Sequence, residues 1–226
     1  MFLKKILIAS YIALQASLVV GCANTNYNQA RDNASAESLA LLHGYDIISS
    51  RAADVVLSEL SNKLQVSLDR ASETELEMPQ IFLVRSPICL ALSQNGILLI
   101  SDHLLVNLDH VAELAFIVAH ETAHTVLKHD ANNSSTGYKH DMEIEADHVG
   151  LGLVALAGYN PWYSIDALIK AYSCNYWAST KSHPSLQARS DAMAKDLMSL
   201  GVGDNSTDFG NRDFKKLKWL IANQKI

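Results

Sequence analysis

Residues 111–127 read VAELAFIVAHETAHTVL, an apolar run that contains the motif HETAH at residues 120–124. On a helix, residues four apart lie on one face, so His120 and His124 can direct two imidazoles at a single metal ion. Glu121 is rotated about 100° from His120, which leaves its carboxylate beside the ion. Two neutral nitrogen ligands and a neighbouring base are typical of zinc hydrolases. The alternative is a core helix whose two histidines make ordinary hydrogen bonds.

The composition places the chain among globular proteins. Its 226 residues are enough for one sizeable domain, and 49% hydrophobic with 19% charged residues fits neither a disordered nor a polytopic membrane protein. The formal net charge is −6, and the sequence has no basic stripe. Because nucleic-acid binding depends on basic surfaces, we exclude nucleic acid as a partner.

The N-terminus predicts a targeting segment followed by a tether. A lysine pair precedes an apolar stretch at residues 6–20, which is the order found in secretory signal peptides. The stretch leads into LVVGC at residues 18–22, which resembles a bacterial lipobox. We therefore expect a signal peptide at residues 1–21, lipid on Cys22 and a polar linker over residues 22–35. The prediction is an outer-membrane lipoprotein that faces the periplasm of a Gram-negative bacterium. An ordinary cleaved signal peptide and an uncleaved anchor are the alternatives.

Two further cysteines, Cys89 and Cys174, would lie in that oxidising compartment. They could form one disulfide bond. They could equally be two buried thiols that pack as small hydrophobic side chains. The sequence does not supply the distance between them, so both interpretations stay open.

Hydrophobic periodicity predicts an α+β fold that is mostly helical. Apolar residues recur at helical spacing over residues 36–72, where Gly44 can separate two helices. A short strand is expected at residues 81–84, and Asn95-Gly96 predicts a hairpin between residues 88–92 and 97–101. Asp109 can cap the next helix, which carries HETAH and runs to about residue 129. More helices are expected at 139–157, 162–176 and 185–200.

These elements place the catalytic domain at residues 36–200. Residues 201–226 would form a linker and a basic amphipathic tail, whose apolar residues share one side of a helix. Such a tail either packs back on the domain or binds a membrane surface or a partner.

A third ligand is needed, because catalytic zinc sites use three protein ligands and leave one position open. Glu143 begins the next predicted helix, which a short loop would force into antiparallel packing. Asp147 lies one turn further on the same face and can hydrogen-bond a ligand imidazole. Glu145 is about 200° around the helix from Glu143 and is interpreted as a surface acid. His129 follows His124 by five positions, on a different face, and is interpreted as a helix-end residue.

Several motifs in order resemble a known family. The order is ELA at 113–115, HETAH, EIEAD at 143–147, GYNP at 158–161, and His183-Pro184 with Arg189. Together they resemble the HtpX- and BepA-type zinc metallopeptidases, the gluzincin family that includes the CAAX prenyl endoproteases. The resemblance spans about half of the chain and implies a zincin-like domain with a small β-sheet bordering the cleft.

The resemblance implies a ligand set and a base. His120, His124 and Glu143 would bind one zinc ion per chain. Glu121 would take a proton from zinc-bound water as the water attacks a peptide carbonyl, and would return the proton to the leaving amine.

Three further residues would support this chemistry. The family places Asp147 beside the site, as a catalytic or supporting group. His183 would approach the metal as a regulatory or transition-state group, and Arg189 would neighbour His183. Two features depart from the family: the loop before Glu143 is short, and ICL stands at residues 88–90 where relatives often carry Asn-Ala-Phe on the strand bordering the cleft. No transmembrane pair is visible, so the lipoprotein branch fits best.

The predicted function is a zinc endopeptidase that cleaves unfolded or misassembled cell-envelope proteins. The substrate would bind as an added strand on the hairpin edge, an arrangement that recognises backbone more than side chains. An assembly-machinery partner is possible. The alternative is a latent protease that acts mainly as a periplasmic chaperone for outer-membrane proteins, with His183 in the open metal position. A third interpretation, zinc as a structural staple, is weaker because structural sites usually close with four ligands.

Overall fold

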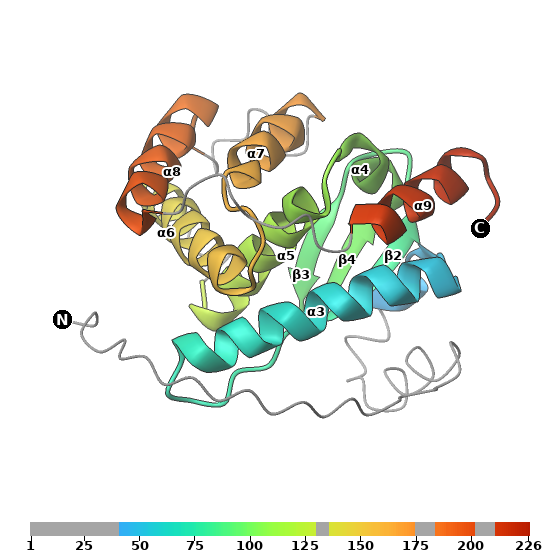
Figure 1. Cartoon of the computed structure of the whole chain (residues 1–226), viewed down its shortest axis with the longest axis horizontal. Coiled ribbons are helices and arrows are strands. Elements are labelled where there is room, and N and C mark those ends of the chain that lie inside the picture. The colour runs from blue at the N-terminus through green and yellow to red at the C-terminus, as the bar shows by residue number, and fades with distance from the viewer. Residues whose placement is uncertain (1–40, 130–135, 175–183, 202–210) are drawn as a thin grey trace.

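The helix that carries HETAH lies between a small sheet and a group of helices (Figure 1). The structure is a computed structural model that describes residues 41–129, 136–174, 184–201 and 211–226. The predicted fold class is confirmed, because the described residues are mostly helical and contain one four-stranded sheet. The predicted signal peptide, the linker with Cys22, and His183 lie outside the described residues.

The sheet has the order β1-β2-β4-β3 and mixes parallel and antiparallel pairs. β2 (Gln80–Arg85) is parallel to β4 (Ile97–Ser101), while β1 (Asp46–Ile47) and β3 (Ala91–Gln94) run antiparallel to their neighbours. The predicted hairpin is confirmed as β3 and β4, although its first strand spans residues 91–94 and not 88–92. Its turn residues Asn95 and Gly96 have φ of 51° and 75°, and left-handed conformations at both positions are what a two-residue hairpin turn requires. In the strand order, β3 is the last strand and lies at an edge of the sheet.

Alternating side chains of the sheet serve two hydrophobic clusters. Leu83, Leu98 and Ile100 belong to the main core, which the helices complete. Phe82 and Leu99 point to the opposite face, into a smaller cluster. That cluster is closed by β1 and the segment before it, with Leu42, Tyr45 and Ile47.

The described residues contain seven helices, six of which were predicted; the short one at residues 102–107 was not. The seven are α3 (Arg51–Ala71), α4 (Asp102–Asn107), α5 (Val111–Val126), α6 (Thr136–Leu156), α7 (Tyr163–Ser173), α8 (Leu186–Leu200) and α9 (Asn211–Ala222). The helical stretch predicted over residues 36–72 is wrong at residues 46–47, which form β1, and the helix there begins only at Arg51. α5 contacts α3, α6, α7 and strand β3, and residues 111–123 are all buried. The helix that bears the motif is thus the centre of the core.

The start of α5 corrects one prediction. The N-cap is His110, whose Nδ1 accepts a hydrogen bond from the backbone N–H of Ala112, and not Asp109. Asp109 instead accepts a hydrogen bond from Lys170 Nζ of α7 at 2.8 Å. The buried carboxylate of Glu113 also contacts Lys170, at 2.7 Å, and accepts from the backbone N–H of Asp109. An acid just before a helix often caps it, but here the ion pair with Lys170 of α7 holds the Asp109 carboxylate instead.

The two cysteines form a disulfide bond, Cys89–Cys174, with a Cα–Cα distance of 6.0 Å. The bond joins the segment before β3 to the end of α7. It links the sheet side of the molecule to the helical side, across 85 positions of sequence.

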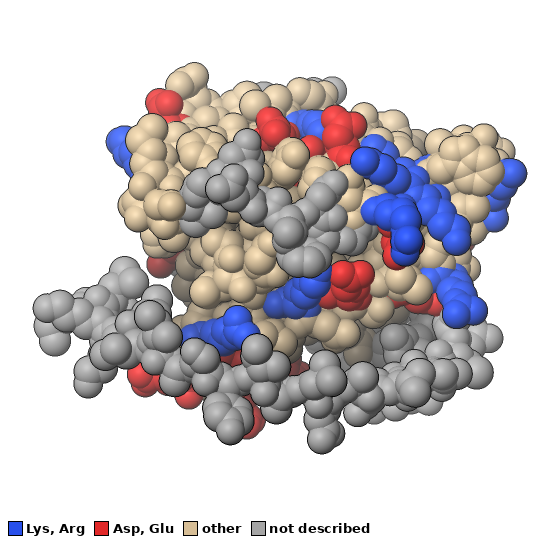
Figure 2. Space-filling model, viewed as in Figure 1, with Lys and Arg blue, Asp and Glu red and all other residues tan. Residues whose placement is uncertain are grey.

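The C-terminal helix α9 packs back on the domain. Phe214 and Leu217 are buried in the main core, and α9 contacts α3 and α4. Lys and Arg side chains gather over the outer face of α9 (Figure 2), among them the exposed Lys215 and Lys216. Across the described part of the chain, no helix combines the length and hydropathy that crossing a bilayer requires.

Candidate metal centre

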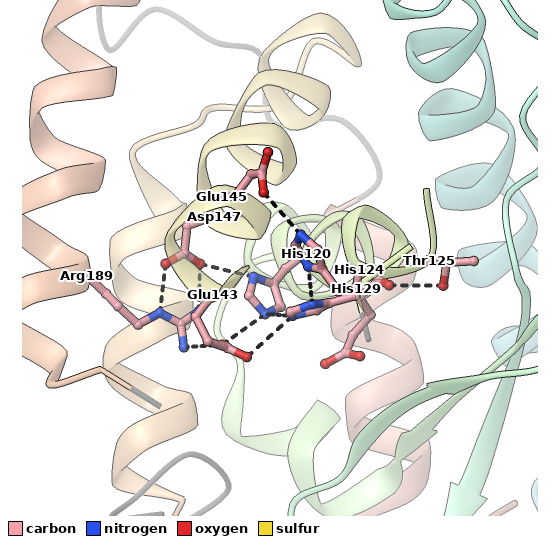
Figure 3. A network of polar contacts seen from close by, with 9 residues as sticks. His120, His124, Thr125, His129, Glu143, Glu145, Asp147 and Arg189 are labelled. Atoms are coloured by element: carbon pink, nitrogen blue, oxygen red, sulfur yellow. Dashed lines mark hydrogen bonds and ion pairs between the residues drawn. The ribbon is translucent and has the colours of Figure 1, made fainter. Parts of the chain in front are cut away.

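Three donor groups converge where α5 meets α6 (Figure 3). His120 and His124 lie one turn apart on α5, and their Nε2 atoms are 3.1 Å apart. Glu143 of α6 directs Oε2 at His120 Nε2, 3.6 Å away, and Oε1 at His124 Nε2, 3.5 Å away. The structure thus brings together the three residues that the sequence analysis singled out as ligands.

The spacing of the donors fits a small tetrahedral ion. Zinc binds imidazole nitrogen and carboxylate oxygen at about 2.0–2.2 Å, and two ligands of a tetrahedron are then about 3.3 Å apart. The observed separations of 3.1, 3.5 and 3.6 Å bracket that value. Two nitrogens and one oxygen are also a donor set that zinc accepts. The residues present therefore fit the metal that the sequence predicts.

The charges around the donors fit a divalent cation as well. Glu121, Glu143 and Asp147 are buried carboxylates, and Arg189 is the buried cation beside them. In the form that binds a metal, with both imidazoles neutral and the three acids ionised, these groups leave an excess of two negative charges. Uncompensated charge in an interior is costly, and a divalent ion would neutralise it.

A glycine allows α6 to approach α5 closely at this point. Gly150 faces the backbone of His120, and a Cβ added at Gly150 would lie 3.0 Å from the His120 nitrogen and 3.2 Å from its Cα. Any larger residue would meet backbone atoms of the buried helix. Gly150 therefore sets how near Glu143, which is on the same helix, comes to the two imidazoles.

His120 is held from behind by a buried ion pair. Its Nδ1 lies 3.0 Å from Asp147 Oδ1, and Arg189 of α8 holds Asp147 with two bonds, Nε to Oδ2 at 2.7 Å and Nη2 to Oδ1 at 2.6 Å. Arg189 Nη1 also lies 3.1 Å from Glu143 Oε2, and the Arg189 side chain is 0% exposed. One guanidinium thus orients a ligand carboxylate and the acid behind a ligand imidazole. Resemblance placed Arg189 beside His183, which lies outside the described residues.

The pKa values follow from burial and these contacts. Burial opposes the ionised form of Asp147, but Arg189 outweighs it and holds the pKa of Asp147 below its ordinary value. Burial also opposes the protonated ring of His120, but hydrogen bonds to Asp147 and Glu143 raise the pKa of His120 to about 9. Burial and the neighbouring His120 lower the pKa of His124 to about 3. His124 is thus a neutral nitrogen donor at pH 7.

Glu121 lies beside the donor group and is not part of it. Its side chain is buried, and burial raises its pKa to about 7. The backbone N–H of Ser93, on the edge strand β3, lies near the Glu121 carboxylate and lowers its pKa. A second link joins the strand to α5, since the hydroxyls of Ser93 and Thr125 are 3.0 Å apart. A buried acid with this pKa is suited to accept and return a proton at neutral pH.

The sequence analysis missed two residues near the centre, His129 and Glu145. His129 Nδ1 lies 2.8 Å from His124 Nδ1, and His129 Nε2 lies 3.3 Å from Glu145 Oε2. His129 was assigned to a different face because helical spacing was assumed to continue through residue 129. α5 ends at Val126, and the turn that follows changes the direction of the chain. Glu145 is the surface acid that its position on α6 predicted, with a side chain that is 59% exposed, but its contact with His129 was not predicted.

Comparison with known proteins gives a match that includes His120 and His124 but not Glu143. A search of curated proteins gave no match. Residues 59–140 match the model of Peptidase family M48, over somewhat more than a third of the chain. The matched part contains strands β2, β3 and β4 and all of α5, with His120, Glu121 and His124, and it ends just before Glu143. Residues 59–140 are thus similar to the metallopeptidases of family M48.

Proposed function

We propose that the protein is a zinc-dependent endopeptidase that hydrolyses peptide bonds of unfolded or misassembled cell-envelope proteins. The observation that carries the proposal is the convergence of His120 Nε2, His124 Nε2 and the Glu143 carboxylate, with Glu121 beside them. A purely structural zinc site would have no use for a buried acid beside its ligands. Three ligands and an adjacent base are the parts of a hydrolytic site.

The chain's own residues divide the work of hydrolysis. Zinc, when bound, supplies a Lewis acid that polarises the peptide carbonyl and makes water more acidic. Glu121 accepts the proton of the attacking water and donates it to the leaving amine. The Ser93 N–H lies near the Glu121 carboxylate and favours its ionised form. Asp147 accepts the Nδ1 proton of His120, which keeps Nε2 as the donor atom. From the sequence, His183 is the candidate to stabilise the developing oxyanion.

The edge strand β3 is the proposed substrate platform. β3 pairs with β4 on one side and lies beside α5 on the other, where Ser93 meets Glu121. An extended polypeptide could add a strand along this edge through main-chain hydrogen bonds, with its carbonyl near the metal. Folded proteins rarely present an extended strand, so unfolded chains are the expected substrates.

The proposed location is the periplasmic face of the outer membrane, with Cys22 as the lipid-bearing residue. The support is the sequence of the first 22 residues together with the Cys89–Cys174 disulfide, since disulfides persist in oxidising compartments. Within the M48 family, the HtpX- and BepA-type lipoprotein branch is the subgroup that we propose. The partner that we propose there is an outer-membrane assembly machinery.

The test is cleavage of an unfolded model protein by the full chain, purified in detergent, beside its Glu121→Gln variant. Zinc content is measured in both. We expect both proteins to hold one zinc ion and cleavage by the variant to fall by about 10²–10⁴-fold, the usual contribution of a positioned base. Equal cleavage by the two proteins would contradict the role of Glu121. Zinc bound without cleavage in either would favour the latent, chaperone-like alternative.

A further inference from the structure

The end of α5 folds back on itself and carries His129 to the metal centre. The backbone N–H of Lys128 donates to the Thr125 carbonyl at 3.2 Å, and that of His129 donates to the His124 carbonyl at 3.0 Å. This pair of bonds is a Schellman motif, in which one residue must adopt the left-handed conformation. Lys128 does so, with φ of 55°. The motif places the residue after it beside the helix turn that it has just left.

The side chains then form a chain of contacts from His124 to the surface (Figure 3). His124 Nδ1 and His129 Nδ1 are 2.8 Å apart, and the two rings meet at 70° with centroids 4.9 Å apart. His129 Nε2 continues to Glu145 Oε2 at 3.3 Å. The His129 side chain is only 5% exposed, whereas Glu145 is 59% exposed. A surface acid on α6 is thus connected to a ligand on α5 through a buried imidazole.

One arrangement of protons satisfies every member of this chain. If Nε2 of His124 is to hold a metal, its lone pair must be free and the proton of the neutral ring must sit on Nδ1. Nδ1–H of His124 then donates to Nδ1 of His129, which fixes the proton of His129 on its own Nε2. That N–H donates to the Glu145 carboxylate. The opposite arrangement would leave Glu145 facing a lone pair and would place a proton on the donor atom of His124.

We propose that His129 and Glu145 are positioning residues that hold His124 in the tautomer and orientation needed to bind the metal. The inference rests on the proposed function for its importance in catalysis, but not for its test. With this proposal, each of the two ligand imidazoles has a partner that holds its Nδ1 atom. His120 is held at Nδ1 by Asp147, which Arg189 holds in turn. His124 is held at Nδ1 by His129, which Glu145 holds in turn.

His124 needs this support more than His120 does, because it is less buried. It lies in the last turn of α5, and its side chain is 22% exposed, against 1% for His120. Without His129, the ring could rotate toward solvent or place its proton on Nε2. Groups that orient metal-bound histidines typically contribute about 10–100-fold to metal affinity or activity.

The test measures zinc affinity of the metal-free full chain by competition with a chromophoric chelator, so it does not depend on cleavage. His129→Leu removes the acceptor, and we expect zinc to bind about 10–100-fold more weakly. His129→Asn offers an amide oxygen near the place of Nδ1, and we expect it to recover part of the loss. Glu145→Met removes only the exposed end of the chain, and we expect a two- to fivefold loss, about the worth of an exposed ion pair.

The matched control is His148→Leu. His148 is on α6 and also pairs with an acid, Asp196, at 2.9 Å, but its side chain is 65% exposed and it does not contact the donors. We expect its zinc affinity to equal that of the wild type. Cobalt(II) can replace zinc as a spectroscopic probe, and its absorption bands should shift in His129→Leu and not in the control.

Each result decides the matter. Wild-type zinc affinity in His129→Leu would overturn the proposal. If that variant fails to fold, His129→Asn and Glu145→Met carry the decision, and wild-type affinity in both would overturn it equally. Wild-type protein that binds zinc tightly but cleaves nothing would contradict the proposed endopeptidase and leave this inference standing.

Discussion

Replacing Gly150 by alanine tests whether the close approach of α5 and α6 builds the metal centre. The new Cβ would lie 3.0 Å from the His120 nitrogen, 3.2 Å from His120 Cα and 3.4 Å from the Ala119 carbonyl carbon. All three are backbone atoms of a helix that is buried along most of its length. No flexible side chain can yield, so α6 itself must move, by the difference between 3.0 Å and an ordinary contact of 3.4 Å or more.

Two opposing terms set the expected free energy of unfolding. Alanine is favoured over glycine within a helix by about 0.5–1 kcal/mol. Forcing one extra carbon into a packed core costs about 1–3 kcal/mol. We therefore expect Gly150→Ala to lower the stability by about 1 kcal/mol. The displacement of α6 also carries Glu143 away from the imidazoles, so we expect weaker zinc binding.

Gly152 is the matched control, because it lies on the same helix and a Cβ there would meet nothing within 4 Å. Gly152→Ala should keep the helix gain alone and stabilise the protein by about 0.5–1 kcal/mol. The difference between the two variants then isolates the clash. The assay is urea unfolding of the metal-free proteins, with zinc affinity measured by chelator competition. Equal stabilisation of both variants, with unchanged zinc binding, would refute the argument that Gly150 sets the helix spacing.

Three further predictions concern the residues that hold the fold and the site. Lys128→Gly should stabilise the protein by about 1 kcal/mol in urea unfolding, because glycine adopts the left-handed conformation more readily, and zinc affinity should not change. Destabilisation would contradict this account of the α5 terminus. Arg189→Met should lower the stability of the metal-free protein by about 3–5 kcal/mol, since it leaves the buried Asp147 without its cation; a neutral effect in the same assay would argue against the buried pair. Replacing Cys89 and Cys174 together by serine should lower the melting stability by about 2–4 kcal/mol, and a wild-type transition would show that the bond adds nothing.

Local signals predicted a large share of this fold. The dipeptide Asn95-Gly96 predicted the hairpin because few other sequences adopt two left-handed conformations in succession. Helical periodicity predicted six of the seven described helices, since each buries one face or more. It missed the short helix α4, and it wrongly extended the first helical stretch over residues 46–47, which form β1. The ligand positions His120, His124 and Glu143 depend on the same periodicity, and the structure brings them within reach of one ion.

Long-range pairing was not predictable in this way. Strand β1 has two residues, too few for any period, and it is held by pairing with β2. The parallel pairing of β2 with β4 places strands side by side whose connection contains β3, and nothing in either strand's composition specifies that partner. The prediction that Asp109 caps α5 was wrong for a related reason, because the residue that pairs with Asp109, Lys170, lies 61 positions away.

The contact between His129 and His124 was not predicted because of the turn at Lys128. Five positions on a continuous helix would separate His129 from His124 by about 140°, so a sequence argument places them on different faces. The Schellman motif ends the helix before that separation is reached, and it does so at Lys128, where the usual glycine signal is missing. The spacing within one helix therefore predicted His120 with His124, and Glu143 with Asp147 behind the ligands. It did not predict His129. His129 reaches the site through the end of a helix, where the turn and not the spacing decides which side chain arrives.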